Sequence, residues 1–227
     1  LDNRYRVEEW IGGGAFSNVY RGTDIQKEDR PVALKVIHRA HAKQAASQSQ
    51  FEENNPFEHE ARYNQMLKNG WVARAYKATK TKEGLNYIVM EFVDGMTLER
   101  WVRTNGPLSP LQAFQLAEGL LAYLTEAHTV GFAHGDIKSS NIMVSSTTSS
   151  RFRFKVVDLG HARWFRTPLR PRDHMVGTPA YLAPELVQGG TVDPRAELYA
   201  VCVVMYKAAT GESPLQTKRN NADEMIE

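Results

Sequence analysis

A short polar run, His134-Gly135-Asp136-Ile137-Lys138-Ser139-Ser140-Asn141, brings three chemically useful side chains close together in the sequence. The Asp136 carboxylate could accept a hydroxyl proton, and the Lys138 ammonium could neutralise a phosphate. The Asn141 amide could offer its oxygen to a hard metal ion. A polar turn with an Asp cap would have the same residues, so the run alone leaves both interpretations open.

Further charged residues stand at the ends of apolar strands. Lys35 follows Val32-Ala33-Leu34, where an ammonium is costly unless a phosphate or a carboxylate pairs with it. Glu60, on an expected helix, is a candidate partner, and the alternative is a strand-edge lysine whose charged end reaches water. Asp158 leaves an apolar strand shortly before Gly160, which suits a Mg²⁺ ligand, although a single Asp there is more often a turn residue.

Glycines interrupt the first expected strand in Ile11-Gly12-Gly13-Gly14-Ala15-Phe16-Ser17-Asn18-Val19. Such a loop lets backbone N–H groups approach a phosphate closely, although glycine-rich hairpin turns are also common. It is not a Walker A loop, because no Gly-Lys-[Ser/Thr] follows. A last motif is Gly177-Thr178-Pro179-Ala180-Tyr181-Leu182-Ala183-Pro184-Glu185. Each motif is a modest signal alone, and their order and spacing together carry the argument.

The composition excludes several other classes of protein. The 227 residues include 28 Lys+Arg and 26 Asp+Glu, and a net charge of +2 does not by itself indicate a nucleic-acid or membrane partner. The single Cys202 excludes an internal disulfide and a cysteine-cluster zinc site, and it suits a reducing, cytoplasmic compartment. No run approaches the ~20 apolar residues that span a bilayer, and no signal peptide is visible.

The elements that must position these residues change in type along the chain. Strands dominate the first part, with a loop or frayed helix at 42–55, a helix at about 56–69, and a hairpin of 76–79 and 85–93. Helices dominate the second part. Ser109 and Pro110 predict the start of a long helix. Its expected apolar stripe consists of Leu111, Phe114, Ala117, Leu121 and Leu124.

Two short strands at 142–144 and 154–157 follow, and a later helix at 198–209 is apolar all round, which predicts that it is buried. The organisation is therefore a β-rich lobe of about 95 residues followed by an α-rich lobe.

The five motifs together resemble a eukaryotic-type serine/threonine protein kinase domain, from about Tyr5 to about Pro214. The resemblance implies one kinase domain over 1–227 with an α+β, two-lobe fold: a β-rich N-lobe with one helix (about 1–93) and an α-rich C-lobe (about 94–227). It also implies a C-terminal truncation. The distal C-lobe helices, with the Arg that usually pairs with Glu185, are expected to be missing from this sequence.

The resemblance also implies a site for ATP and Mg²⁺. Lys35 would hold the α- and β-phosphates and pair with Glu60 in preference to Glu58, which fits the helix register less well. Asp136 resembles the catalytic Asp, assisted by Lys138, while Asn141 and Asp158 resemble the Mg²⁺ ligands. The other residues expected at the nucleotide are Ile11, Gly12, Gly13, Gly14, Ala15, Phe16, Ser17, Asn18, Val19, Ala33, Met90 as gatekeeper, the backbones of Glu91 and Val93, and Met143.

The substrate class follows from two places in the resemblance. Lys138, two residues after Asp136, is similar to the serine/threonine kinase pattern, and so is Gly177-Thr178-Pro179. Thr178 is expected to hydrogen-bond Asp136 and Lys138. The implied reaction is transfer of the ATP γ-phosphoryl group to a Ser or Thr hydroxyl of a protein substrate, mostly by positioning and charge neutralisation.

Three departures from the family pattern bear on function. Gly135 replaces the Arg that receives an activation-loop phosphate in many kinases, so we expect an enzyme that needs no such phosphorylation. Asn64 stands where an apolar residue is usual, which predicts a loosely docked helix. Glu197 stands where an Asp usually holds the catalytic loop, which predicts that the loop is held differently.

These departures keep a pseudokinase open as the alternative, an ATP-binding or scaffolding module without phosphoryl transfer. The intact set of catalytic residues favours the active enzyme. A small-molecule phosphotransferase is a third interpretation, against which the segment 177–185 argues, because such an enzyme has little use for a peptide-docking segment.

Overall fold

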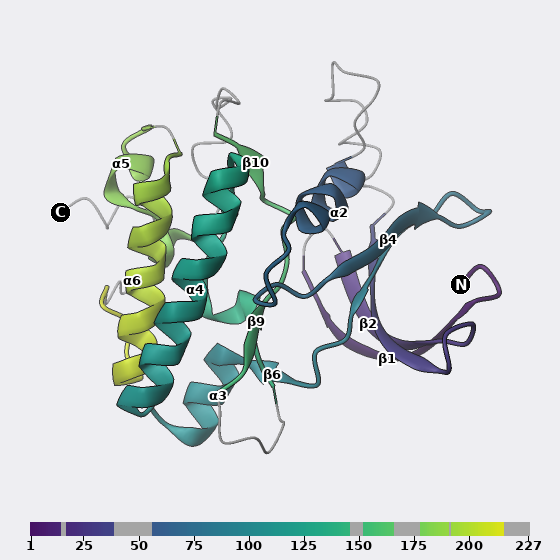
Figure 1. Cartoon of the computed structure of the whole chain (residues 1–227), viewed down its shortest axis with the longest axis horizontal. Coiled ribbons are helices and arrows are strands. Elements are labelled where there is room, and N and C mark those ends of the chain that lie inside the picture. The colour runs from purple at the N-terminus through teal and green to yellow at the C-terminus, as the bar shows by residue number, and fades with distance from the viewer. Residues whose placement is uncertain (15–16, 39–55, 146–151, 166–177, 191, 216–227) are drawn as a thin grey trace. The chain divides into compact units, whose positions relative to one another are not determined.

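A computed structural model describes residues 1–14, 17–38, 56–145, 152–165, 178–190 and 192–215 (Figure 1). The chain divides into two compact units. The first comprises Leu1–Lys68 and Ala73–Val93, and the second comprises Asn69–Val72 and Asp94–Glu227. The loop that the sequence predicts at 42–55 lies outside the described residues.

The first unit is built on a five-stranded antiparallel sheet in the order β1-β2-β3-β5-β4, with β1 and β4 at its edges. Its described elements are β1 (Tyr5–Gly13), β2 (Ser17–Asp24), β3 (Arg30–Ile37), α2 (Pro56–Met66), β4 (Ala75–Lys80) and β5 (Asn86–Glu91). The predicted helix is confirmed, but it ends at Met66 instead of residue 69. The hairpin that the sequence predicts is formed by β4 and β5.

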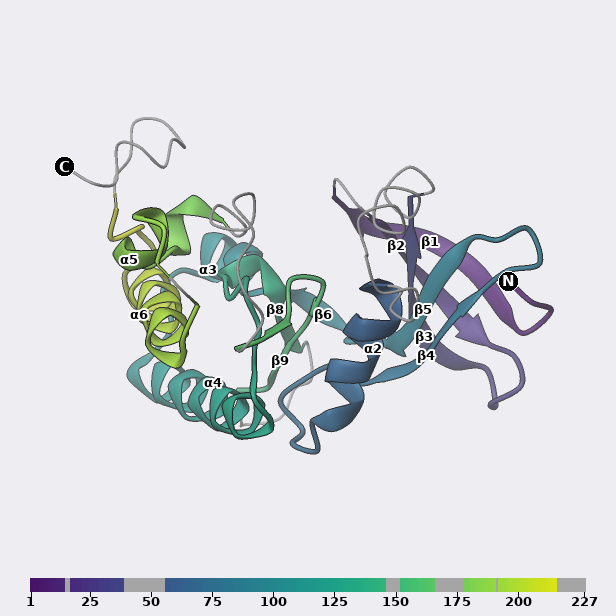
Figure 2. The same ribbon diagram turned by 90° about the horizontal axis from the view of Figure 1, so that it is seen from above.

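Alternation along β5 divides the core of this unit between the two faces of the sheet. Tyr87 and Val89 pack on one face with Val32 and Leu34. Ile88 and Met90 point to the other face. There the helix α2 covers the sheet, and its Ala61 belongs to the same cluster (Figure 2). The helix is therefore attached to the face that carries Met90.

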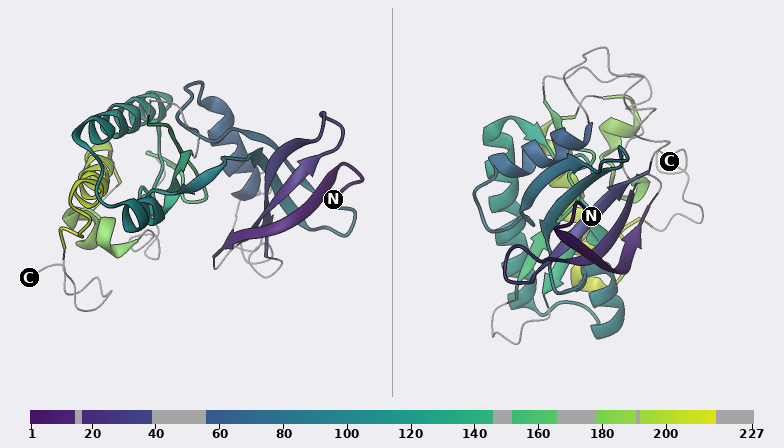
Figure 3. Two further views of the ribbon diagram at one scale, coloured as in Figure 1. Left: turned by 90° about the horizontal axis from the view of Figure 1, so that it is seen from below. Right: turned by 90° about the vertical axis from the view of Figure 1, so that its right-hand side faces the viewer.

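The second unit contains two long helices, α4 and α6, that run side by side (Figure 3). This unit also contains a three-stranded sheet in the order β6-β8-β9 and a two-stranded sheet of β7 and β10. The elements are β6 (Gly95–Thr97), α3 (Leu98–Asn105), α4 (Pro110–Val130), β7 (Phe132–Ala133), β8 (Ile142–Ser145), β9 (Phe154–Val156), β10 (Arg163–Trp164), α5 (Pro184–Val187) and α6 (Pro194–Thr210), with short 3-10 turns at Ser139–Asn141 and Pro179–Tyr181.

The start of α4 follows the sequence prediction. Ser109 Oγ accepts a hydrogen bond from Gln112 N, and Gln112 Oε1 accepts one from Ser109 N at 2.9 Å, so the two residues form a capping box. Pro110 occupies the first helical position, where its missing N–H costs nothing.

The apolar stripe that the sequence indicates on α4 does not form the buried face of this helix. Leu111, Phe114 and Leu121 are exposed, and Leu124 alone among the large members of that stripe is buried. The buried face of α4 consists of Leu116, Gly119, Leu120, Tyr123, Leu124 and Ala127. Both sets have helical spacing, so periodicity could not decide which of them faces the core.

The prediction that residues 198–209 are buried all round is also wrong. Leu198 is 42% exposed, Tyr206 is 47% exposed, and Cys202 between them is exposed too. These residues recur every four positions and share one face of α6.

Within the described residues, no helix combines the length and the apolar composition needed to cross a bilayer.

Candidate active site

In the first unit, a lysine and a glutamate form a buried ion pair. Lys35 lies within β3, opposite Val19 of β2 and Ile88 of β5, so the sheet fixes its backbone on both sides. Its Nζ is 2.8 Å from each carboxylate oxygen of Glu60 on α2. Lys35 is 8% exposed and Glu60 is 4% exposed, so each charge depends on the other. Glu58 is exposed, and the pairing with Glu60 is the one that the sequence favoured.

The glycine-rich segment forms the end of the β1–β2 hairpin. Gly12 is paired with Val19 and Gly13 with Asn18, and Gly14 N donates to Ser17 O at 2.9 Å. Ala15 and Phe16 lie outside the described residues. Ile11 is exposed on β1, so it is available to a ligand.

The expected adenine-binding residues lie on several strands. Ala33 of β3 is paired directly with Met90 of β5, and Met90 is buried under α2. The N–H of Glu91 donates to Arg74 O at 2.8 Å. By contrast, the N–H of Val93 makes no hydrogen bond within the described residues, so this donor could meet a purine base. Met143 belongs to the second unit, on β8 opposite Lys155.

In the second unit, Asp136 is the centre of a hydrogen-bonded group of side chains. Its carboxylate is 2.6 Å from Lys138 Nζ and accepts a hydrogen bond from Thr178 Oγ1 at 3.1 Å. Lys138 Nζ also donates to Thr178 Oγ1 at 3.0 Å, so the three residues form a closed triangle. Both contacts that the sequence analysis expected of Thr178 are present. Asp136 is therefore held in one orientation, as an acceptor beside a cation.

Asn141 closes the loop that carries Asp136. The 3-10 turn at Ser139–Asn141 folds its side chain back, and Nδ2 donates to Asp136 O at 2.9 Å and to Asp136 Oδ2 at 3.1 Å. The Asn141 side-chain oxygen accepts no hydrogen bond within the described residues. An amide oxygen is a ligand that Mg²⁺ accepts, so this atom fits a metal ligand.

Strand pairing brings Asp158 to the same end of β8 and β9 as Asn141. Ile142 is paired with Val156, and Val157 N donates to Asn141 O at 2.8 Å. Asp158 has φ +66, a left-handed conformation that is costly for a residue other than glycine and that clusters at functional sites. The described residues hold no group of three His, Cys, Asp or Glu side chains suited to a metal, so a cation here would need phosphate or water oxygens as well.

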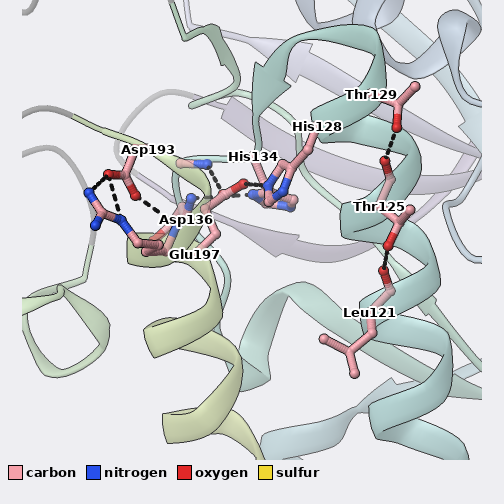
Figure 4. Close-up of polar contacts among 10 residues, drawn as sticks. Leu121, Thr125, His128, Thr129, His134, Asp136, Asp193 and Glu197 are labelled. Atoms are coloured by element: carbon pink, nitrogen blue, oxygen red, sulfur yellow. Dashed lines mark hydrogen bonds and ion pairs between the residues drawn. The ribbon is translucent and has the colours of Figure 1, made fainter.

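Glu197 of α6 binds the loop that carries Asp136. Its Oε1 accepts a hydrogen bond from Gly135 N at 2.9 Å, and its Oε2 is 2.8 Å from His128 Nε2. Figure 4 shows the Glu197 side chain directed toward His128 on α4. The longer Glu therefore binds the loop and a second helix together. This role of His128 could not be predicted from the sequence, because nothing in its local pattern distinguishes it from a polar residue near a helix end.

Loss of contact with water favours the neutral form of two histidines of this region, the buried His134 and the partly buried His161. Burial lowers the pKa of His134, which is fully enclosed, and it lowers the pKa of His161 as well. His134 Nδ1 accepts a hydrogen bond from Asp136 N at 3.3 Å, which requires the unprotonated form of that nitrogen. His134 is thus a neutral support of the loop.

These features define a class of protein. The structure has a buried pair of Lys35 and Glu60, and a triangle of Asp136, Lys138 and Thr178. The motifs that carry these residues occur along the chain in the order of the protein kinase motifs. The sequence pattern of the protein kinase domain family matches residues 5–227, and the chain belongs to the protein kinase family.

Similar proteins are serine/threonine-protein kinases by name. PknL of Mycobacterium tuberculosis is 35% identical over 216 residues, which are 94% of this chain and 51% of PknL. PknB of Mycobacterium leprae is 34% identical over 219 residues, which are 94% of this chain and 33% of PknB. A probable PknB of Lactococcus lactis is 33% identical over 217 residues. The chain thus spans about half the length of PknL and a third of PknB.

Proposed function

We propose that residues 1–227 are the catalytic domain of a serine/threonine protein kinase, with an N-lobe of about 1–93 and a C-lobe of about 94–227. The observation that carries the proposal is the triangle of Asp136, Lys138 and Thr178. It provides an oriented proton acceptor and a cation at one place, which is what transfer to a hydroxyl requires. The protein substrate would supply a Ser or Thr hydroxyl, as the names of the relatives support.

Asp136 would orient the attacking hydroxyl and accept its proton. Lys138, held 2.6 Å from that carboxylate, would neutralise negative charge that develops on the transferred group. Thr178 would hold the side chains of Asp136 and Lys138 in fixed positions through its hydrogen bonds to both. Because these contacts hold the three side chains together, little reorganisation would be needed when the substrate binds.

The residues of the chain fit ATP and Mg²⁺. Lys35 would bind the α- and β-phosphates, oriented by Glu60, and Asn141 and Asp158 would hold Mg²⁺. Val93 N–H and the Glu91 carbonyl would meet the base, with Val19, Ala33 and Met143 around it, Met90 behind it and the hairpin from Ile11 to Val19 over the phosphates. When bound, Mg·ATP supplies the phosphoryl group and the cation that neutralises its charge.

The proposal is tested by incubating the chain with γ-labelled Mg·ATP and dephosphorylated casein, followed by phosphoamino-acid analysis. We expect label on Ser and Thr. Asp136→Asn should lower the rate at least about 100-fold, because a positioned general base contributes roughly 10²–10⁴-fold. Asp29→Asn is the matched control, since Asp29 is an exposed carboxylate on the β2–β3 turn and should leave the rate unchanged.

Stabilisation against heat by Mg·ATP, measured in parallel, separates the alternatives. A chain that binds Mg·ATP but transfers no label would be a pseudokinase. Nothing in the comparisons favours that alternative. Label found on Tyr, or equal rates for Asp136→Asn and wild type, would also overturn the proposal.

A further inference from the structure

The side chain of Asn64 joins α2 to the start of β4. Asn64 is 3% exposed, and its Nδ2 donates to Ala73 O at 2.7 Å. Its Oδ1 accepts a hydrogen bond from Ala75 N at 2.6 Å. The sequence predicts that this buried amide leaves the helix loosely docked. Instead, each end of the amide has a backbone partner, so the residue ties the helix down.

The geometry of β4 explains why these two backbone groups need a partner. Arg74, between the two alanines, turns toward β5, where its O accepts from Glu91 N and its N donates to Glu91 Oε2. Because backbone groups alternate in direction along a strand, Ala73 O and Ala75 N point to the opposite side. That side is the outer edge of the sheet, where no described strand pairs with β4. The Asn64 amide takes the place of a neighbouring strand there.

Asn64 is also one helical turn from Glu60. Residues four positions apart lie on the same face of a helix, so the face that binds β4 also presents Glu60 to Lys35. In the apolar cluster with the sheet, α2 is represented by the small Ala61, which packs with Ile37, Ala75, Ile88 and Met90. Small side chains leave few ridges to resist rotation or sliding. Two directional hydrogen bonds at Asn64 do resist it.

We propose that Asn64 is a positioning residue that sets the rotation of α2 and thereby places Glu60 against Lys35. In this chain a polar contact performs a task for which an apolar side chain was expected at this position. The inference rests on the proposed function only where it concerns catalysis. The placement of Glu60 itself can be measured without any turnover.

The test compares wild type with Asn64→Leu, which keeps the branched shape and the number of side-chain heavy atoms and removes both hydrogen bonds. Asn69→Leu is the matched control, because Asn69 also binds backbone groups through its amide but belongs to the other unit. The nucleotide-free proteins are labelled with acetic anhydride, and mass spectrometry gives the ratio of acetylation at Lys35 to that at the exposed Lys27. Thermal melting confirms that each variant is folded.

We expect Asn64→Leu to raise the Lys35:Lys27 ratio roughly ten- to hundred-fold. The reason is that buried polar groups lose their partners, which shifts the equilibrium from the docked helix toward a displaced one. The KM for ATP should rise, while the KM for the protein substrate stays unchanged. Asn69→Leu should change neither. A folded Asn64→Leu with the wild-type ratio and the wild-type KM for ATP would overturn the inference, whatever its melting temperature.

If Asn64→Leu does not fold, Asn64→Asp decides between the same outcomes. A protonated Asp can still donate to Ala73 O, whereas an ionised Asp cannot. Burial raises the pKa of a carboxyl group, so an Asp at this enclosed position should be protonated to a larger extent at about pH 6 than at about pH 9. The excess labelling of Lys35 over wild type should therefore be larger at about pH 9. A ratio that follows wild type over this whole range contradicts the inference. Labelling needs no phosphoryl transfer, so an inactive wild type would overturn the proposed function and leave this result standing.

Discussion

Gly135 offers a direct test of how the catalytic loop is held. It has φ +81, and its N–H is bound by Glu197. A Cβ built on Gly135 would lie closer than 3.0 Å to the carbonyl oxygen of His161, which is backbone and cannot turn aside. Gly106 has φ +84 and belongs to the same unit, but nothing lies within 4 Å of a Cβ built on it. Gly106→Ala is thus the matched control for Gly135→Ala.

The two alanines share one cost and differ in another. A backbone with φ near +80 costs an L-residue about 1–3 kcal/mol, and this applies to both variants. At Gly135 the overlap with His161 adds roughly 1–3 kcal/mol, the usual range for forcing extra atoms into a packed site. Gly135→Ala should therefore lower the free energy of unfolding by about 2–6 kcal/mol, against about 1–3 kcal/mol for Gly106→Ala.

Urea unfolding followed by tryptophan fluorescence measures both costs, and the casein assay measures phosphoryl transfer under conditions where the variants remain folded. We expect Gly135→Ala to lose transfer because Asp136 moves with its neighbour, and Gly106→Ala to keep it. Equal costs for the two variants, together with undiminished transfer by Gly135→Ala, would refute the argument that a glycine is required at this point of the loop.

Four further outcomes follow from the site. Glu60→Gln removes the charge that pairs with Lys35 and should raise the KM for ATP about tenfold, with steady-state kinetics as the measurement. Glu197→Ala should lower the free energy of unfolding by roughly 1–3 kcal/mol in urea, because it leaves Gly135 N–H without its acceptor, while Glu197→Gln should lose less. The pKa of His134 is lowered in the folded state, so its contribution to stability is complete above the unfolded value of about 6.5 and declines as the pH falls below it. Urea unfolding at about pH 7.5 and 5.5 should show that decline, and equal stabilities would contradict it. Phosphatase treatment should leave transfer unchanged, because Gly135 offers no cation to an activation-loop phosphate, and loss of activity on treatment would disprove this.

Much of the site could be predicted because its groups lie close together in sequence or on strongly patterned elements. Asp136, Lys138 and Asn141 share one loop, and their chemistry is visible in the residue types. The choice of Glu60 over Glu58 depended only on helix register, and the structure pairs Glu60 with Lys35. In these cases, local spacing and chemical type already restrict the geometry.

Other features depend on contacts that the local pattern does not contain. His128 and Glu197 are in contact although they are far apart in the chain, and the residues around each of them give no sign of this contact. The partners of the Asn64 amide are backbone groups, which any sequence provides. On α4, exposed Phe114 and buried Leu120 belong to two stripes of similar periodicity, and only tertiary packing selects between them.

The short segment Asn69–Val72 belongs to the second unit although the chain returns to the first unit after it. Trp71 O accepts from Val156 N at 2.7 Å, and the indole stacks on Phe154 with ring centroids 5.0 Å apart. A ribosome makes Trp71 long before it makes Phe154, at roughly 5–20 residues per second. The nascent chain therefore carries an uncovered indole for several seconds. Chaperones act on apolar surface that is exposed during folding, and a fragment cut near residue 93 would leave the indole without Phe154 permanently.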